Sequence, residues 1–157
     1  MAENHFEKSV KALQTDNGKE YCNEKMDKFL KSQGIQRRLS APRTPEQNGL
    51  AERKNRVLVE AVRCMLSYSG LPLAFWREAL MTANYIRNRC PTMGLNGDIP
   101  YAKWFGKLPD LKFFKIFGAK VCVLNKAPKN KLTEKAEDGR FVGYSNESKA
   151  YRVWVPE

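Results

Sequence analysis

The chain has 157 residues, of which 42% are hydrophobic and 11% aromatic, so it can bury a core and is not an intrinsically disordered chain. Its 28 lysines and arginines outnumber 17 acidic residues, and the net charge of +11 favours a polyanionic partner, most commonly nucleic acid. No apolar run reaches the roughly 18 residues that cross a membrane, and no secretory signal is expected at the N-terminus. A basic surface without a polyanionic partner is the alternative that charge alone leaves open.

The cysteines argue against a zinc centre. Cys22, Cys64, Cys90 and Cys122 lie far apart, and His5 is the sole histidine. Structural zinc sites need a full set of Cys or His ligands, usually in closely spaced pairs. We therefore expect free, buried thiols in a protein of a reducing compartment.

The N-terminal third predicts a strand, a helix and a second strand. Residues 10–15 alternate weakly and run into Asp16-Asn17-Gly18, which is typical of a strand followed by a turn. Asn23 can cap a helix that ends at Gly34; its apolar face is expected to hold Met26, Phe29 and Leu30. Residues 35–39 then predict a short strand, and the prolines and glycine of residues 40–49 predict a loop.

Helices dominate the middle of the chain. A long helix is predicted from about residue 48 to residue 69, with a buried stripe made of Leu50, Val57, Leu58, Ala61, Val62, Met65 and Leu66. Pro72 opens a second helix that ends before Pro91. Its inward residues are expected to be Phe75, Trp76, Ala79, Leu80, Ala83 and Ile86. Pro100 starts a short helical turn.

The C-terminal part is predicted to be β. Residues 120–124, 140–144 and 150–155 are short segments rich in β-branched and aromatic residues, and Asp138-Gly139 indicates a turn before the second of them. A basic loop is expected over residues 125–135. The prediction is a mixed α/β segment followed by a small β unit.

Two acidic residues occupy positions where a metal site can form. Asp16 follows a strand, and Glu52 lies in the first turn of the long helix. Carboxylates that converge from such positions can hold Mg²⁺, and a pair of such ions can drive phosphodiester transfer. Each residue also has a structural explanation, because Asp-Asn-Gly is a common turn and an acid in a first helical turn favours the helix dipole.

The long helix also carries a polar face. Glu52, Asn55, Arg56 and Val59 share one side by helical spacing, next to a mostly basic strip made of Arg53, Arg56, Glu60 and Arg63. Guanidinium and amide groups presented from one side suit docking on a phosphate backbone. A solvated charged face opposite the apolar stripe is the alternative that periodicity alone leaves open.

Longer motifs resemble a known family. Residues 13–20 (LQTDNGKE), 34–37 (GIQR) and above all 41–56 (APRTPEQNGLAERKNR) closely resemble copia-type retrotransposon integrases. The resemblance continues downstream through 70–72 (GLP), 75–76 (FW), 88–89 (NR), 91–92 (PT), 100–101 (PY), 104–106 (WFG), 117–118 (FG) and 141–144 (FVGY).

The resemblance implies a fold and a site. Residues 1–108 would be the C-terminal part of an RNase H-like integrase core, and residues 113–157 an SH3-like β unit that could lack its last strands. In this family an Asp, Asp, Glu triad binds Mg²⁺ or Mn²⁺, and Asp16 and Glu52 match the second Asp and the Glu. The expected DNA contacts, from the resemblance, the helix face and the basic loop together, are Asn48, Arg53, Asn55, Arg56, Arg63, Lys126, Lys129 and Lys131.

The implied activity is joining of the element's DNA ends to host DNA in the nucleus, by an enzyme that is multimeric when intact. Residues 1–15 contain Glu3 and Glu7 but no Asp, so the first triad acid is missing and the fragment is expected to be inactive alone, with weak or absent metal binding. The alternative is a relic or recruited protein that binds nucleic acid, or a protein partner, without catalysis. A purely structural or dimerisation role is a third hypothesis.

Overall fold

The computed structural model describes residues 3, 5, 7–16, 18–39, 49–124, 135–145 and 147–156, without the side chain of Leu50. The chain divides into two compact units, Met1–Asn55 and Arg56–Glu157. No helix among these residues is long and apolar enough to cross a membrane.

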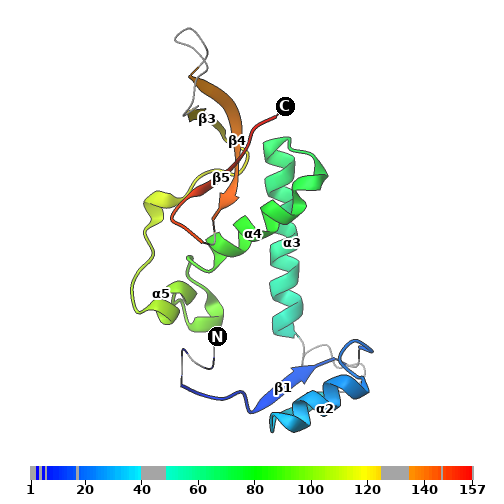
Figure 1. The fold of residues 1–157 in the computed structure, drawn as a ribbon. Helices are drawn as coiled ribbons and strands as arrows, with labels where there is room; N and C mark the ends of the chain where they lie inside the picture. Colours follow the sequence, from blue (N-terminus) through cyan, green and yellow to red (C-terminus); the bar gives the residue numbers. More distant parts are fainter. Residues whose placement is uncertain are drawn as a thin grey trace. The chain divides into compact units, whose positions relative to one another are not determined.

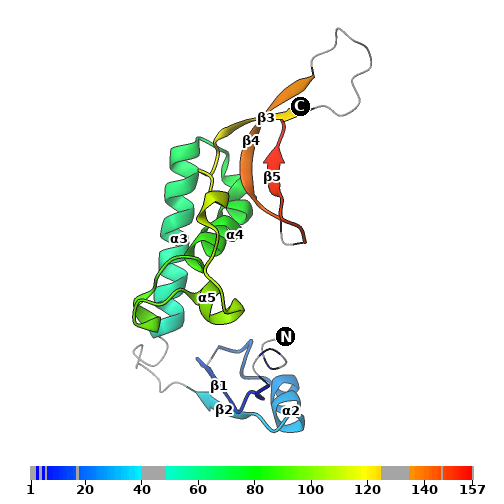
Figure 2. The ribbon, with the colours of Figure 1, turned by 90° about the vertical axis from the view of Figure 1, so that its left-hand side faces the viewer.

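The first unit is a small parallel strand pair with one helix. Strand β1 (Ala12–Thr15) pairs in parallel with β2 (Gln36–Leu39), and helix α2 (Glu24–Ser32) lies between them in the chain (Figure 2). Parallel neighbours need such a crossover, and α2 supplies it. The predicted strand, helix and strand are therefore confirmed, and Leu30 is the buried residue of α2, whereas Phe29 is 56% exposed.

Local signals at its two ends fix α2. The Asn23 side chain accepts a hydrogen bond from the Met26 N–H at 2.9 Å, which satisfies one of the unpaired donors of the first turn. At the other end Gly34 has φ +65°, and the Ile35 N–H reaches the Leu30 carbonyl at 2.9 Å. This left-handed glycine ends the helix, as its position in the sequence predicts.

Helices α3 (Gly49–Ser69) and α4 (Trp76–Arg87) follow, with the 3-10 turn η2 (Leu73–Phe75) between them (Figure 1). Three short turns come next: η3 (Met93–Leu95), α5 (Pro100–Phe105) and η4 (Leu111–Phe113). The predicted helices are confirmed. Trp76 does not point inward as expected, because it opens α4 with 56% of its surface exposed, while Ala79 and Ala83 are buried.

The three remaining strands form an antiparallel sheet in the order β3 (Lys120–Leu124), β4 (Ala136–Tyr144) and β5 (Tyr151–Trp154). The predicted turn at Asp138-Gly139 is wrong, because both residues lie within β4 and pair with residues of β3. A side chain at Gly139 would come within 2.6 Å of Val153 Cγ1, so this glycine permits close packing inside the sheet.

The sheet packs on the helices of the second unit. The core cluster joins residues of α3, α4 and β4 with the segments between them: Leu66, Leu71, Ala79, Phe117 and Val142. Helices α3 and α4 and the sheet thus share one core. The division between a segment ending near residue 108 and a β unit from residue 113 stays a prediction.

The thiols are free, as expected, but their predicted burial is wrong. Cys22, Cys64 and Cys122 are exposed and Cys90 is half-buried. Cys64 lies on the exposed side of α3 and Cys122 on an exposed position of β3, because the core takes larger apolar side chains in both elements.

Candidate metal-binding carboxylates and nucleic-acid interface

Asp16 lies at the carboxyl end of β1, directly after the buried Thr15. Because β1 and β2 are parallel and Thr15 aligns with Leu39, both strands end at the same edge of the pair. The carboxyl edge of parallel strands is where open α/β sheets bind ligands. Asp16 is exposed there, so its carboxylate is accessible to ions from solvent.

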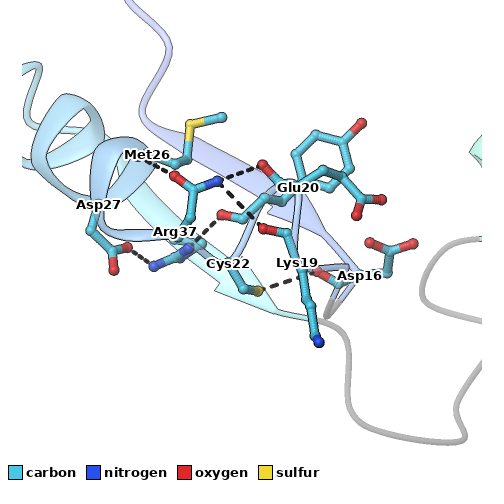
Figure 3. Close-up of polar contacts among 9 residues, drawn as sticks. Asp16, Lys19, Glu20, Cys22, Met26, Asp27 and Arg37 are labelled. Atoms are coloured by element: carbon cyan, nitrogen blue, oxygen red, sulfur yellow. Dashed lines mark hydrogen bonds and ion pairs between the residues drawn. The ribbon is translucent and has the colours of Figure 1, made fainter.

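The turn after Asp16 is held by polar contacts to the backbone (Figure 3). Asp16 Oδ1 accepts a hydrogen bond from the Gly18 N–H at 3.1 Å, so the carboxylate also performs the structural role that its turn sequence predicts. Arg37 of β2 donates to the Tyr21 carbonyl at 2.7 Å and forms an ion pair with Asp27 of α2. These contacts tie the turn to both neighbouring elements, and no residue that the structure describes hydrogen-bonds to the second carboxylate oxygen of Asp16.

Glu52 is exposed in the first turn of α3. Among the described residues no group of three or more His, Cys, Asp or Glu side chains could hold a metal ion. Both donors are hard carboxylate oxygens of the kind that Mg²⁺ and Mn²⁺ take. The donor chemistry of both carboxylates therefore fits a divalent cation, and their assignment as metal ligands stays a prediction.

The polar face of α3 is exposed as predicted. Arg53, Asn55, Arg56 and Arg63 are all exposed, while Val62, Met65 and Leu66 on the other side pack into or against the core. None of these arginines forms an ion pair with any residue that the structure describes, although Glu52 and Glu60 lie on the same helix. Their charges are thus available to an external anion.

The remaining predicted DNA contacts, Asn48, Lys126, Lys129 and Lys131, lie outside the described residues. Their contribution stays a prediction.

The sequence did not predict a second group of charged and aromatic residues in the second unit. Tyr85 of α4 stacks on Tyr144 of β4 with ring centroids 3.8 Å apart, and the Arg89 guanidinium lies 3.4 Å from the Tyr85 ring centre. Burial raises the pKa of the Tyr144 phenol, against the opposing effect of the Lys115 N–H that donates to its oxygen at 3.0 Å. The four-residue spacing of Tyr85 in α4 and Arg89 just after its end was the available signal, but their partners come from distant segments.

Comparison with known proteins identifies relatives of this chain. Residues 119–157 match the model of the retroviral polymerase SH3-like domain. Over 99% of its length the chain is 38% identical to the retrovirus-related Pol polyprotein from transposon TNT 1-94 of Nicotiana tabacum. Over 96% it is 37% identical to the corresponding polyprotein from transposon RE2 of Arabidopsis thaliana. The homologues of this chain are Pol polyproteins of copia-type and Ty1 transposons.

The chain spans about a tenth of the length of these Pol polyproteins, 12% of the first and 10% of the second. It also resembles a chain of the simian T-cell lymphotropic virus intasome solved in complex with PP2A regulatory subunit B56 gamma. That likeness has a TM-score of 0.52 at 17% identity and covers 98% of this chain and 58% of the other, so it concerns the fold alone. The predicted mixed α/β fold class with a C-terminal SH3-like unit is confirmed.

Proposed function

We propose that the chain is a segment of a retrotransposon integrase that binds DNA through the exposed face of α3. The observation that carries the proposal is the row of guanidinium groups on that face, Arg53, Arg56 and Arg63, which form no ion pair among the described residues of a chain homologous to Pol polyproteins. Arginine presents a planar fork of donors that matches phosphate oxygens. Asn55 adds an amide on the strip that it shares with Glu52 and Arg56, next to the arginine row, so the helix can offer donors to several groups of a nucleic-acid backbone.

Asp16 and Glu52 are the proposed metal ligands of this integrase. When bound, a pair of Mg²⁺ or Mn²⁺ ions activates the attacking oxygen and stabilises the leaving one in DNA strand transfer. Asp16 would offer its carboxylate from the carboxyl edge of the strand pair, where the Gly18 N–H orients it. Glu52 would offer its carboxylate from the start of α3, beside the arginines that hold the phosphate backbone.

The 157-residue chain alone is proposed to lack this activity and to bind the metal weakly or not at all. Residues 1–15 contain no Asp, and removing one ligand from a two-metal site weakens both ions. We expect no joining of labelled oligonucleotides in Mg²⁺ or Mn²⁺ above the level of a chain with Asp16→Asn and Glu52→Gln. Joining that depends on these two carboxylates would contradict the proposed inactivity and leave the integrase assignment intact.

The proposed partners are the DNA ends of the element and host target DNA, reached in the nucleus. The similar viral chain was solved as part of an intasome. For this chain a multimer is proposed for the intact integrase.

DNA binding is tested by the salt dependence of duplex affinity. Each phosphate contact contributes about 0.9 to the slope of log affinity against log salt. We expect the pair Arg56→Gln and Arg63→Gln to weaken duplex binding at low salt and to lower the slope by about 1.8. The matched control changes Arg77 and Arg87 to Gln, which are exposed arginines on α4.

Comparing the α3 pair with the α4 pair distinguishes docking of the duplex on α3 from nonspecific attraction of DNA to a basic protein. A loss that is specific to the α3 pair supports docking through this face. Equal losses in the α3 pair and the α4 pair would show that net charge alone binds the duplex, and would reject α3 as the interface.

A further inference from the structure

A pocket of about 490 Å³ opens in the second unit, and the described residues that line it include no residue of α3, no proposed DNA contact and no proposed metal ligand. Its walls come from the end of α4, from α5, from residues 107–113 and from the connection between β4 and β5. This volume falls in the range of sites for small molecules and could hold one nucleotide.

Arg89 is held in this pocket by aromatic rings. Its guanidinium carbon lies 3.4 Å from the centre of the Tyr85 ring and 4.6 Å from that of Tyr101, and its Nη1 donates to the Tyr85 carbonyl at 3.1 Å. Tyr85 is itself fixed from its other side by the stacked Tyr144. The guanidinium is thereby ordered before any ligand arrives, and most of its N–H donors have no partner among the described residues.

Two lysines bring further positive charge to the same pocket. Lys107 and Lys149 are exposed and line it, and the Lys149 ammonium lies 4.9 Å from the centre of the Phe113 ring. Asp110 is the carboxylate of the lining, and its Oδ1 accepts a hydrogen bond from the Lys112 N–H at 3.0 Å. No ion pair joins Arg89, Lys107 or Lys149 to any carboxylate in the described part of the chain.

The pocket therefore combines these three cations with aromatic, apolar and hydroxyl groups. Cations suit a phosphate, while Tyr101 and Leu108 offer apolar surface to a sugar or a base, and Ser148 offers a hydroxyl. A base inside a duplex is stacked and cannot enter such a concave site unless it is extruded. These features favour a nucleotide that is not paired.

We propose that this pocket binds one unpaired nucleotide of single-stranded DNA, with Arg89, Lys107 and Lys149 on its phosphates. The proposal rests on the proposed function as a nucleic-acid-binding chain, but it concerns a separate surface. Binding of single strands depends on the pocket, whereas binding of duplex depends on the exposed face of α3. The two can therefore fail independently.

The test compares the affinities of the full chain for labelled single-stranded oligothymidylate and for a short duplex, by fluorescence anisotropy. Lys107→Ala combined with Lys149→Ala removes two exposed charges and should not disturb the fold. It is expected to weaken single-strand binding about tenfold or more and to lower its salt slope by about 0.7 for each phosphate that is no longer neutralised. The control with Lys25→Ala and Lys31→Ala removes two exposed charges from α2 and should change single-strand binding far less.

A second variant places a negative charge in the pocket. Ser148→Asp should weaken single-strand binding while duplex binding keeps its wild-type affinity. If the pocket variants and the α2 control have equal affinities for single strands, the pocket is not the binding site of the unpaired nucleotide. This conclusion holds even where duplex binding still depends on α3. Competition by a phosphoserine peptide, but not by thymidine monophosphate, also overturns the proposal in favour of a phosphoprotein partner.

Discussion

Gly118 shows how a single residue controls the start of the sheet. It has φ +77°, its N–H donates to the Phe141 carbonyl at 2.8 Å, and an added Cβ would lie 2.2 Å from Ser69 Cβ at the end of α3. A left-handed backbone and an approach this close both require glycine. The residue therefore couples the end of α3 to the approach to β3.

We expect Gly118→Ala to destabilise the second unit severely. The left-handed backbone costs about 1–2 kcal/mol for alanine, and overpacking against Ser69 adds about 1–3 kcal/mol. The control Gly70→Ala has a similar φ of +66° but open space around the new methyl group, so only the backbone cost applies. Urea unfolding followed by circular dichroism compares them, and equal losses in the two variants would contradict the packing argument.

Tyr144 is expected to make the free energy of unfolding depend on pH in the alkaline range. Burial raises the pKa of its phenol above the ordinary 10.0, which means that the folded state favours the neutral form. This stabilisation is present below the unfolded pKa and is lost as pH rises through the raised folded pKa.

The free energy of unfolding should therefore fall above pH 10, and Tyr144→Phe should make this decline shallower. Urea unfolding at a series of alkaline pH values measures it. Tyr68→Phe, which removes an 80% exposed residue's hydroxyl, should keep the wild-type profile. A decline that is as steep in Tyr144→Phe as in the wild type would refute this assignment.

At the scale of elements, α4 and β4 meet at an irregularity of the sheet. The pairing of β4 with β5 shifts between Phe141 and Gly143, so Val142 has no partner residue in β5. The buried Thr82 of α4 donates its hydroxyl to the Val142 carbonyl at 3.3 Å. The helix thus supplies a hydrogen-bond donor to a backbone carbonyl at the irregularity.

Thr82→Val keeps the side-chain shape and removes this donor. Leaving a buried carbonyl unsatisfied should lower the free energy of unfolding by about 1–3 kcal/mol. Thr82→Ser retains the hydroxyl and should recover most of the loss, apart from the missing methyl group. The comparison uses chemical denaturation, and a Val variant more stable than the Ser variant would show that packing rather than the hydrogen bond decides.

Elements whose ends depend on local chemistry could be predicted from the sequence. Asn23 and Gly34 bound α2, Gly70 follows the end of α3, and Pro100 opens α5 as predicted. The interpretation of Asp138-Gly139 failed because a glycine in a strand and a glycine in a turn look alike until the residue opposite is known. Here Gly139 lies in a strand and packs against Val153, which belongs to a later strand.

Over the whole molecule, some parts of the candidate sites could be predicted from the sequence and others could not. The exposed arginines of α3 follow from helical periodicity, so they could be predicted. The pocket around Arg89 could not, because it joins α4, α5 and the end of β4, which only the tertiary fold brings together. The metal-ligand assignments of Asp16 and Glu52 came from family resemblance, and they stay predictions.

Docking of DNA on the exposed face of α3 can be tested by backbone NMR of the isotope-labelled chain during titration with a short duplex. We predict that the amide resonances of Arg53, Asn55, Arg56 and Arg63 shift together and saturate, and that the shifts reverse as salt is added. Arg77 and Arg87 of α4, equally charged and also exposed, should stay unperturbed. Shifts centred on α4 with α3 unchanged, or no saturable shift at all, would show that DNA does not dock on the exposed face of α3.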